Sequence, residues 1–89
     1  MRAVITVIGK DTKGIIAGVS TELADCEINI LDISQTILQE YFTMIMLVDL
    51  EGMNVTFDEL LKRLDKRSKQ FGVSIKAQHE DIFNSMHEI

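Results

Sequence analysis

The residues with the clearest chemical potential lie in the short stretch GKDTKG, residues 9–14, which joins an apolar run to an amphipathic segment. Two of the five glycines in the chain, Gly9 and Gly14, bracket this stretch. If a helix begins here, its first backbone N–H groups and the positive end of its dipole favour a carboxylate or a phosphate. A plain connection is the competing interpretation, in which Gly9 ends a strand, Asp11 or Thr12 caps the helix and Gly14 eases the turn. The spacing matches neither the dinucleotide-binding motif nor the P-loop, so neither nucleotide site is predicted.

Two polar residues lie in the next apolar stretch, NILDIS, residues 29–34. Asn29 at the start of a strand can bond to turn backbone, or it can hold the ammonium or carboxylate group of a ligand. An ionised carboxylate such as that of Asp32 needs partners or water among apolar neighbours, so it lies either at a wet edge or beside a ligand. Both interpretations stay open for both residues.

The basic residues gather further along the chain, and their spacing favours a solvated helix face over an anion site. Acids precede bases, as the helix dipole favours, and three acid-first pairs stand four residues apart. The two histidines, His79 and His87, lack metal-binding spacing and Cys26 is the single cysteine, so we expect no metal site and no disulfide. No Ser/His/Asp or Cys/His set is evident, and we expect a protein that is not an enzyme and carries no cofactor. The bases are Lys62, Arg63, Lys66, Arg67 and Lys69, and the pairs are Asp58/Lys62, Glu59/Arg63 and Asp65/Lys69.

Length, composition and charge narrow the classes of protein to which the chain can belong. A chain of 89 residues that is 46% hydrophobic and 26% charged makes one globular domain. The net charge of −5 argues against a nucleic-acid partner, because phosphate contacts dominate that affinity. No apolar run reaches the roughly 18 residues of a membrane span, and the N-terminus lacks the features of a signal peptide. We therefore expect a cytoplasmic protein without a membrane partner.

The elements that position these residues follow from hydrophobic periodicity. Residues 3–8, 28–38 and 41–50 are predicted strands, and the first is apolar on both faces and therefore central. Residues 73–78 alternate apolar and polar side chains, which predicts a half-buried strand. After the glycine loop, apolar residues recur at helical spacing over about three turns, and Gly18 within this helix suggests the close approach of a neighbour. The polar residues Thr21, Glu22 and Asp25 lie elsewhere around the helix.

The second helix carries the clearest local signal, and it completes the predicted fold. Thr56 and Glu59 match a capping box, and Gly72 is placed to end the helix. The tail has helical spacing, so we divide the chain into a domain over 1–79 and a helical extension over 80–89. The order βαββαβ, with right-handed crossovers, predicts an α+β ferredoxin-like sandwich. Its antiparallel four-stranded sheet has the order 4-1-3-2, both helices lie on one face, and a short C-terminal helix follows.

The face of this sheet that the helices leave uncovered is unusually apolar. A small monomer rarely exposes so much contiguous apolar surface, so we expect an oligomer, most simply a two-fold homodimer. The alternative is that the C-terminal helix covers this face within the same chain. The uncovered face would carry Val4, Ile8, Ile45 and Leu47, and the covered face Ile5, Val7, Phe42, Met44, Met46 and Val48.

With this layout in place, the segment VITVIGKDTKGIIAGVSTELADCEINILDIS resembles the opening of an ACT domain, the small amino-acid-sensing module. In that family a first strand runs into a D/N-x-P-G-[ILV] loop, then a helix, then an Asn-Ile start to the second strand. The resemblance covers about residues 2–79 and looks closest to short stand-alone ACT proteins; it is also similar to the regulator of the glycine cleavage system. The matching residues are Asp11, Thr12, Lys13, Gly14, Ile15, Asn29 and Ile30.

The resemblance implies a ligand held between two protomers, against the strand–helix loop of one and the second strand of its neighbour. Residues 11–14 would supply backbone contacts, and Asn29 would supply a side-chain contact. Three departures from the family pattern bear on the ligand. Lys13 replaces the usual proline, Gly9 stands where serine-sensing members carry a histidine, and aspartate at position 11 favours the ammonium group of a ligand.

Two hypotheses follow. In the first, the chain is a dimeric regulatory module that binds a small amino acid or related metabolite and acts through a partner protein of unknown identity. In the second, it is a protein-interaction module without a ligand, and its surface is Ile45, Leu47 and the C-terminal helix. Other functions of the same fold are disfavoured, because the loop has no arginine for an acylphosphatase, no Cys-x-x-Cys is present, and the strand aromatics lie at one end of a single strand.

Overall fold

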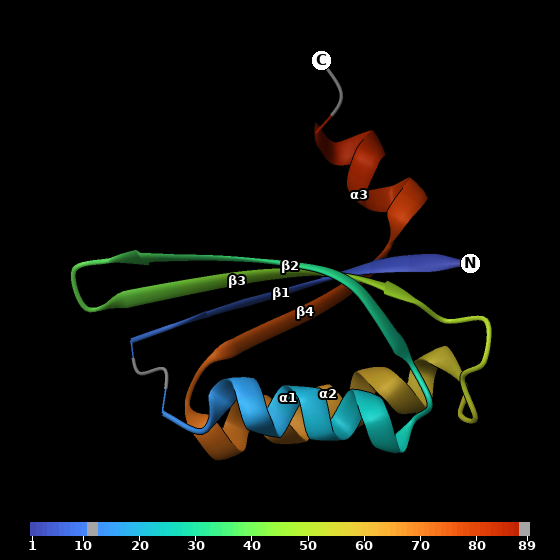
Figure 1. Ribbon diagram of the computed structural model, residues 1–89, viewed down its shortest axis with the longest axis horizontal. Coiled ribbons are helices and arrows are strands. Elements are labelled where there is room, and N and C mark those ends of the chain that lie inside the picture. The colour runs from blue at the N-terminus through green and yellow to red at the C-terminus, as the bar shows by residue number, and fades with distance from the viewer. Residues whose placement is uncertain (11–12, 88–89) are drawn as a thin grey trace.

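The computed structural model describes residues 1–10 and 13–87, and in it the chain forms one sheet with a layer of two helices beneath it (Figure 1). The elements run in the order βαββαβ, followed by a terminal helix. Their bounds are β1 Arg2–Gly9, α1 Ile15–Asp25, β2 Asn29–Leu38, β3 Tyr41–Asp49, α2 Phe57–Phe71, β4 Ser74–His79 and α3 Glu80–His87.

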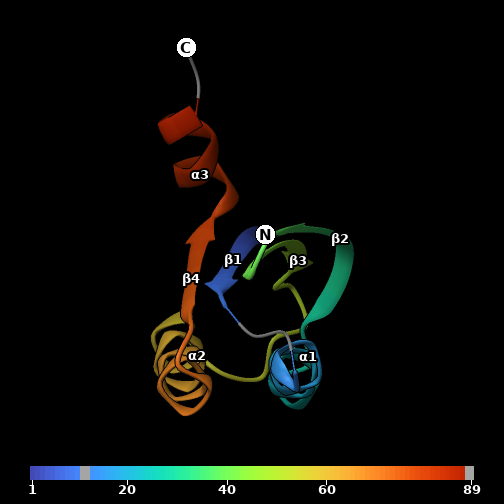
Figure 2. The ribbon, with the colours of Figure 1, turned by 90° about the vertical axis from the view of Figure 1, so that its left-hand side faces the viewer.

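The sheet has the strand order β2-β3-β1-β4 with every neighbouring pair antiparallel. This is the order predicted from the sequence, counted from the other edge, and the ferredoxin-like fold is confirmed. Both helices lie on one face, with α1 on the β2 side and α2 on the β4 side (Figure 2). The two central strands, β1 and β3, are the two that the sequence marked as the most apolar, which agrees with the predicted strand order.

The core lies between the sheet and this helix layer. Ile5 pairs with Met46 and Val7 pairs with Met44, so the four side chains share one face, and all four are buried. Full burial of such a side chain stabilises the fold by about 1.5–3 kcal/mol relative to exposure. The helices complete the core with Ile15, Val19, Leu23, Leu60 and Leu64.

Two local signals in the second half of the chain, the Thr56 cap and the Gly72 stop, are confirmed. The Thr56 hydroxyl accepts a hydrogen bond from the Glu59 backbone N–H at 3.1 Å, and this caps α2. Gly72 ends the helix with a φ of 68°, a left-handed conformation that favours glycine. The Ser68 hydroxyl donates to the backbone carbonyl of Val73, which ties the helix end to the start of β4.

Two glycines mark positions where the layers approach each other closely. A Cβ atom at Gly9 would lie 3.0 Å from Val73 Cβ and closer still to Val73 Cγ1. A Cβ atom at Gly18 would lie 2.5 Å from Phe71 Cε2, so the predicted close approach at Gly18 is confirmed. Both glycines are therefore explained by packing against the end of α2 and the start of β4.

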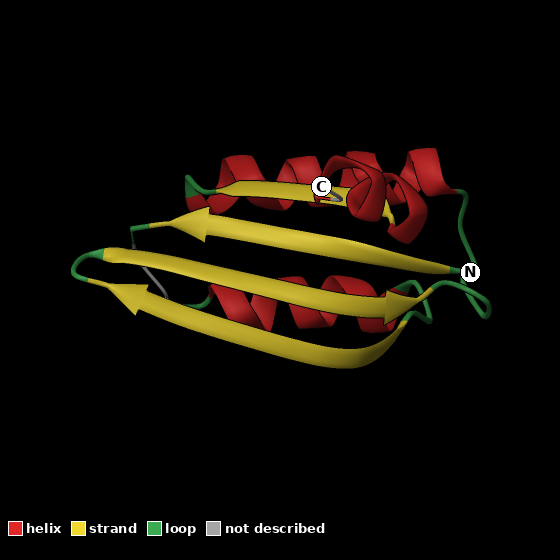
Figure 3. Cartoon of the chain, turned by 90° about the horizontal axis from the view of Figure 1, so that it is seen from above, coloured by secondary structure: helices red, strands yellow, loops and turns green. Residues whose placement is uncertain are grey.

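The side of the sheet opposite α1 and α2, called the open face below, is uncovered over most of its length (Figure 3). Ile8 and Ile45, both predicted to lie there, are 48% and 40% exposed, and Leu47 is half-buried. Val4 departs from the prediction, since it is only 7% exposed. It lies at the end of the open face where α3 contacts β1 and β4. The described part of α3 projects away from the sheet (Figure 1), so the alternative in which the C-terminal helix covers this face within the same chain holds only at the Val4 end.

The edge strand β2 is the most exposed element of the sheet. Every residue from 31 to 38 is exposed, whichever face its side chain occupies. Ile37 and Leu38 reach 68% and 70% exposure. An edge strand with unpaired backbone groups and exposed apolar side chains is a template for pairing with another chain.

Candidate functional site

The start of α1 supplies the first half of the candidate site. The N-cap residue is Gly14, with a φ of 77° and no side-chain cap hydrogen bond. The interpretation of the loop as a plain connection had placed the cap at Asp11 or Thr12, and this was wrong. Asp11 and Thr12 themselves lie outside the described residues. The Gly18 N–H bonds to the Gly14 carbonyl at 2.9 Å. The amides that precede Gly18 in the first turn have no intrahelical acceptor, and this is the anion-binding property of a helix start.

The other predicted loop residues differ in how they can contact a ligand. Lys13 and Gly14 are exposed, so both are accessible from solvent. Ile15 is 1% exposed and its side chain belongs to the core. Only the backbone of Ile15 is therefore available to a ligand.

The start of β2 supplies the second half. Asn29 is exposed and pairs across the ladder with Asp49, while Ile30 is half-buried and pairs with Val48. The ladder shifts register between Ile30 and Asp32. The Asp32 carboxylate is exposed and accepts a hydrogen bond from the Ile33 backbone N–H at 2.9 Å, which agrees with its interpretation as a residue on a wet edge.

The two halves lie at opposite ends of the sheet within one chain. Gly9, which leads into the loop, pairs with Phe42, whereas Arg2 and Asn29 both pair with Asp49. The seven residue steps from Arg2 to Gly9 correspond to roughly 23 Å of strand. A ligand the size of an amino acid cannot touch both halves of one protomer.

A buried ion-pair network between α1 and α2 was missed by the sequence analysis. Glu22 is buried, and its Oε1 accepts from Arg67 Nε at 3.1 Å while its Oε2 accepts from Arg63 Nη1 at 3.4 Å. The prediction that the bases of α2 form a solvated helix face is thus only partly correct, because Arg63 and Arg67 reach across to α1. The signal was present in the spacing, since Glu22 stands three residues after Val19 and four before Cys26 on the buried stripe. The expected pairs Glu59/Arg63 and Asp65/Lys69 do form, at 3.4 and 3.2 Å.

Cys26 lies under this network and is fully buried. Burial raises the pKa of the Cys26 thiol, and the charge of Arg63 acts in the opposite direction. Beside it, a surface groove of about 370 Å³ is lined by both acids and bases of the two helices. Arg63 and Arg67 on α2 both donate to the Glu22 carboxylate on α1. The network therefore joins the two helices of the layer.

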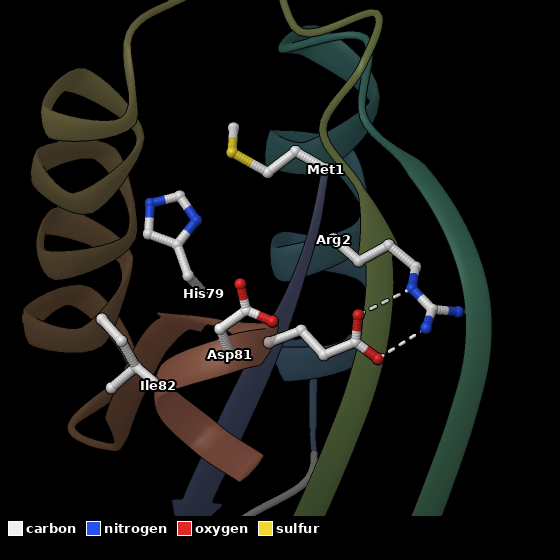
Figure 4. A pocket seen from close by; sticks show the side chains of 6 residues that line it. Met1, Arg2, His79, Asp81 and Ile82 are labelled. Carbon is white, nitrogen blue, oxygen red and sulfur yellow. Dashed lines mark hydrogen bonds and ion pairs between the residues drawn. The ribbon is translucent and has the colours of Figure 1, made fainter. Parts of the chain in front are cut away.

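A larger hollow, of about 570 Å³, opens at the base of α3 (Figure 4). The Arg2 guanidinium donates to both oxygens of Glu80, at 2.8 and 2.6 Å, and fixes the start of α3 against β1. The His79 ring stacks on Phe57 at a centroid distance of 4.2 Å. The hollow is lined by Met1, Arg2, His79, Glu80, Asp81 and Ile82, and none of these is a predicted site residue.

Two properties of the described residues bear on the class of site. Within residues 1–10 and 13–87, no group of three His, Cys, Asp or Glu side chains is placed to hold a metal ion. The described helices include none that is both long and apolar enough to cross a bilayer.

The chain is similar to proteins of one family along nearly its whole length. The family model described as the ACT domain matches residues 2–78. A UPF0237 protein of Clostridium acetobutylicum is 64% identical over 89 residues, which is 100% of both chains. An ACT domain protein from Streptococcus pneumoniae has a TM-score of 0.81 and 43% identity over 93% of each chain. A structure described as a glycine cleavage system transcriptional repressor has a TM-score of 0.67 at 22% identity, over 86% of this chain and 44% of that one, and shares the fold.

Proposed function

The chain belongs to the ACT domain family, and we propose that it is a regulatory module that binds a small amino acid between two copies of itself. One observation carries this proposal. The two halves of the candidate site stand at opposite ends of the sheet, so a second copy is needed to bring a loop and a strand start together.

Pairing of two β2 edges supplies that second copy in the required orientation. Antiparallel pairing reverses the partner strand, so the partner's Asn29 comes to the end of the sheet at which β2 finishes. Ile37 at that end pairs with Phe42, and Phe42 pairs with Gly9, so this is the end that carries the loop. Figure 2 shows α1 on the β2 side of the sheet, so in such a dimer its first turn would lie on the side of the junction. The exposed apolar side chains of β2 support such an interface.

The chemistry at this junction suits an amino acid zwitterion. The first-turn amides of α1 and the positive end of its dipole favour a carboxylate. The aspartate at position 11 in the sequence favours an ammonium group. An amide side chain such as that of Asn29 can donate to one of these groups or accept from the other.

Regulation then follows from differential binding. A ligand that contacts two protomers stabilises the dimer geometry in which both halves meet, and it shifts the population toward that geometry. The change reaches a partner protein through any surface that differs between the bound and free arrangements. In this mechanism the chain binds and transmits, and it catalyses no reaction.

Thermal unfolding against the twenty amino acids and common small metabolites tests the proposal. A ligand at 100 times its Kd adds about 2.7 kcal/mol to the stability of the folded state, and 1 kcal/mol corresponds to roughly 4–8 °C in a domain of this size. We expect one class of amino acid to raise Tm in wild type and not in Asp11→Ala or Asn29→Ala. A flat response across the panel would contradict the proposal.

The second candidate, an interaction module without a ligand, is favoured by the exposure of Ile8 and Ile45 on the open face. Under this alternative the Tm panel is flat, and a partner protein binds wild type and Asn29→Ala equally. Binding of that partner is lost in Ile45→Asp.

A further inference from the structure

We propose that the open face is a second interface between copies of this chain, and that α3 of one copy packs on the open face of another. This interface is separate from the β2 edge that carries the proposed ligand site. It gives the C-terminal helix a function in assembly that the ACT fold itself does not require.

The acceptor surface is the end of the open face far from its own α3. Ile8, Ile45 and Tyr41 belong to one face of the ladder, and each is at least 40% exposed. Two cations border this apolar area. Lys10 places its ammonium 5.7 Å from the centroid of the Tyr41 ring, and Lys76, opposite Thr6 in β4, is exposed on the same face.

The acids on the strands of the open face, Asp49 and Asp32, lie away from this area. Asp49 pairs with Arg2, at the end where α3 begins. Asp32 pairs with Leu47, which in turn pairs with Val4, so it also lies toward that end. Glu40, exposed in the turn directly before Tyr41, is the one acid of the described residues in the strands and turn at this end. The far end of the open face is therefore apolar, with Lys10 and Lys76 on its border and one acid at the turn.

The donor surface has the complementary character. α3 begins with Glu80 and Asp81, and the sequence from residue 80 to residue 89 contains three acids and no lysine or arginine. Ile82 is 52% exposed even though it follows directly after the attachment of α3 to the sheet. Glu80 is already paired with Arg2, which leaves Asp81 as the exposed acid of the first turn. A short helix that projects into solvent with an exposed apolar residue and an exposed acid matches an apolar surface bordered by lysines.

The helix cannot reach the far part of this surface, at Ile8 and Tyr41, in its own chain. The Arg2–Glu80 ion pair fixes the start of α3 beside the first residue of β1. The eight residues of α3 span about 12 Å, whereas the six steps of strand from Arg2 to Ile8 span about 20 Å. Even if α3 lay flat on the open face, its described length would end short of Ile8.

A second copy solves the geometry by symmetry. Two open faces can meet about a two-fold axis that runs between them and across the strands. Such an axis reverses the strands of the partner and carries its α3 to the Ile8 end, and the reciprocal contact forms at the same time. Together with the β2 pairing, this closes an assembly of four chains.

Sedimentation velocity of full-length variants tests the interface. We expect wild type to be a tetramer, and Ile45→Asp and Ile82→Asp each to halve the mass with an unchanged far-ultraviolet circular dichroism spectrum. Leu61→Asp, which changes an exposed leucine on α2, is the matched control and should leave the mass unchanged. A mass that neither Ile45→Asp nor Ile82→Asp lowers overturns the inference.

The β2 edge is tested separately. We expect Ile37→Asp to halve the mass by removing the edge contact. If Ile37→Asp leaves the mass unchanged while Ile45→Asp and Ile82→Asp lower it, the edge dimer of the proposed function fails and the open-face interface stands.

Cross-linking identifies the occupant of the open face. Chains with Ile8→Cys are mixed with differently tagged chains with Ile82→Cys and treated with a short bismaleimide. The native Cys26 is buried, so wild type serves as the unreactive control. We expect a product that contains one chain of each kind. Absence of that product, with a mass that falls in Ile45→Asp alone, means that something other than α3 covers the face, and overturns the inference.

Discussion

Replacement of Gly9 by alanine separates the packing role of this glycine from a role in ligand approach. Gly9 does not have a positive φ, so its backbone accepts an L-residue. In such a position a Gly→Ala change by itself stabilises a protein by about 0.4–1 kcal/mol, because it restricts the unfolded chain. Any loss of stability must therefore come from what the new methyl group contacts.

The structure places Val73 in that space. The new Cβ would lie 3.0 Å from Val73 Cβ and closer to Val73 Cγ1, and a β-branched side chain has little freedom to move away. Overpacking of this kind costs about 1–3 kcal/mol. We predict that Gly9→Ala lowers the free energy of unfolding by that amount, and Tm by roughly 4–8 °C per kcal/mol.

Removal of the opposing methyl groups should relieve the strain. In a Val73→Ala background, Gly9→Ala should carry no cost, because the Gly→Ala change by itself is stabilising. The coupling energy between the two positions should then be at least about 1 kcal/mol. Urea unfolding of the four chains, at one protein concentration because the chain is proposed to associate, measures this cycle.

Two results would refute the reasoning. One is a Gly9→Ala variant as stable as wild type, and the other is a cost that persists undiminished when Val73 is alanine. In the second case Gly9 would be required by the loop itself. Under the packing account, the double variant also keeps the response of wild type to the amino acid panel.

Three further predictions concern stability and reactivity. Glu22→Gln removes a buried charge shared by two arginines and should lower the free energy of unfolding, measured by urea unfolding, by about 1–3 kcal/mol. Glu59→Gln, at an exposed position, should lower it by less than about 1 kcal/mol. Equal effects of the two substitutions would contradict the ion-pair network. Burial raises the pKa of Cys26, so the folded chain keeps its proton while the unfolded thiol, with an ordinary pKa of about 8.5, loses it. The free energy of unfolding should therefore be unaffected by this group below about pH 8 and fall above it more steeply in wild type than in Cys26→Ala; parallel pH curves would count against this. Gly14→Ala should lower Tm by several degrees, because a φ of 77° costs an L-residue about 1–2 kcal/mol, and Gly14→Asn should lower it less.

The fold was predictable because local and global signals agree. Apolar periodicity identified strands and helices, the capping box at Thr56 fixed the start of α2, and right-handed crossovers left one sheet order. The predicted exposure of Val4 was wrong for a reason that hydrophobic periodicity cannot reveal. Its burial depends on the direction in which α3 leaves β4, and the Arg2–Glu80 ion pair between distant parts of the chain helps to set that direction.

The candidate site was only partly predictable. The motif residues from 11 to 15 and at 29 and 30 could be named from the sequence, but their placement at opposite ends of the sheet follows from the antiparallel ladder. The reason for Gly9 lies in Val73, far along the chain, which no local pattern connects to it. Glu22 could have been found, since its spacing placed it on the buried stripe of α1.

The central claim is that each ligand site combines the loop of one protomer with Asn29 of its neighbour. The most direct test mixes two inactive variants, Asp11→Ala and Asn29→Ala, and measures amino acid binding by calorimetry. Random exchange puts about half of the chains into mixed dimers, in which one of two sites has both halves intact, so about a quarter of the binding capacity should return. If the mixture binds no more ligand than either variant alone, the shared site is contradicted.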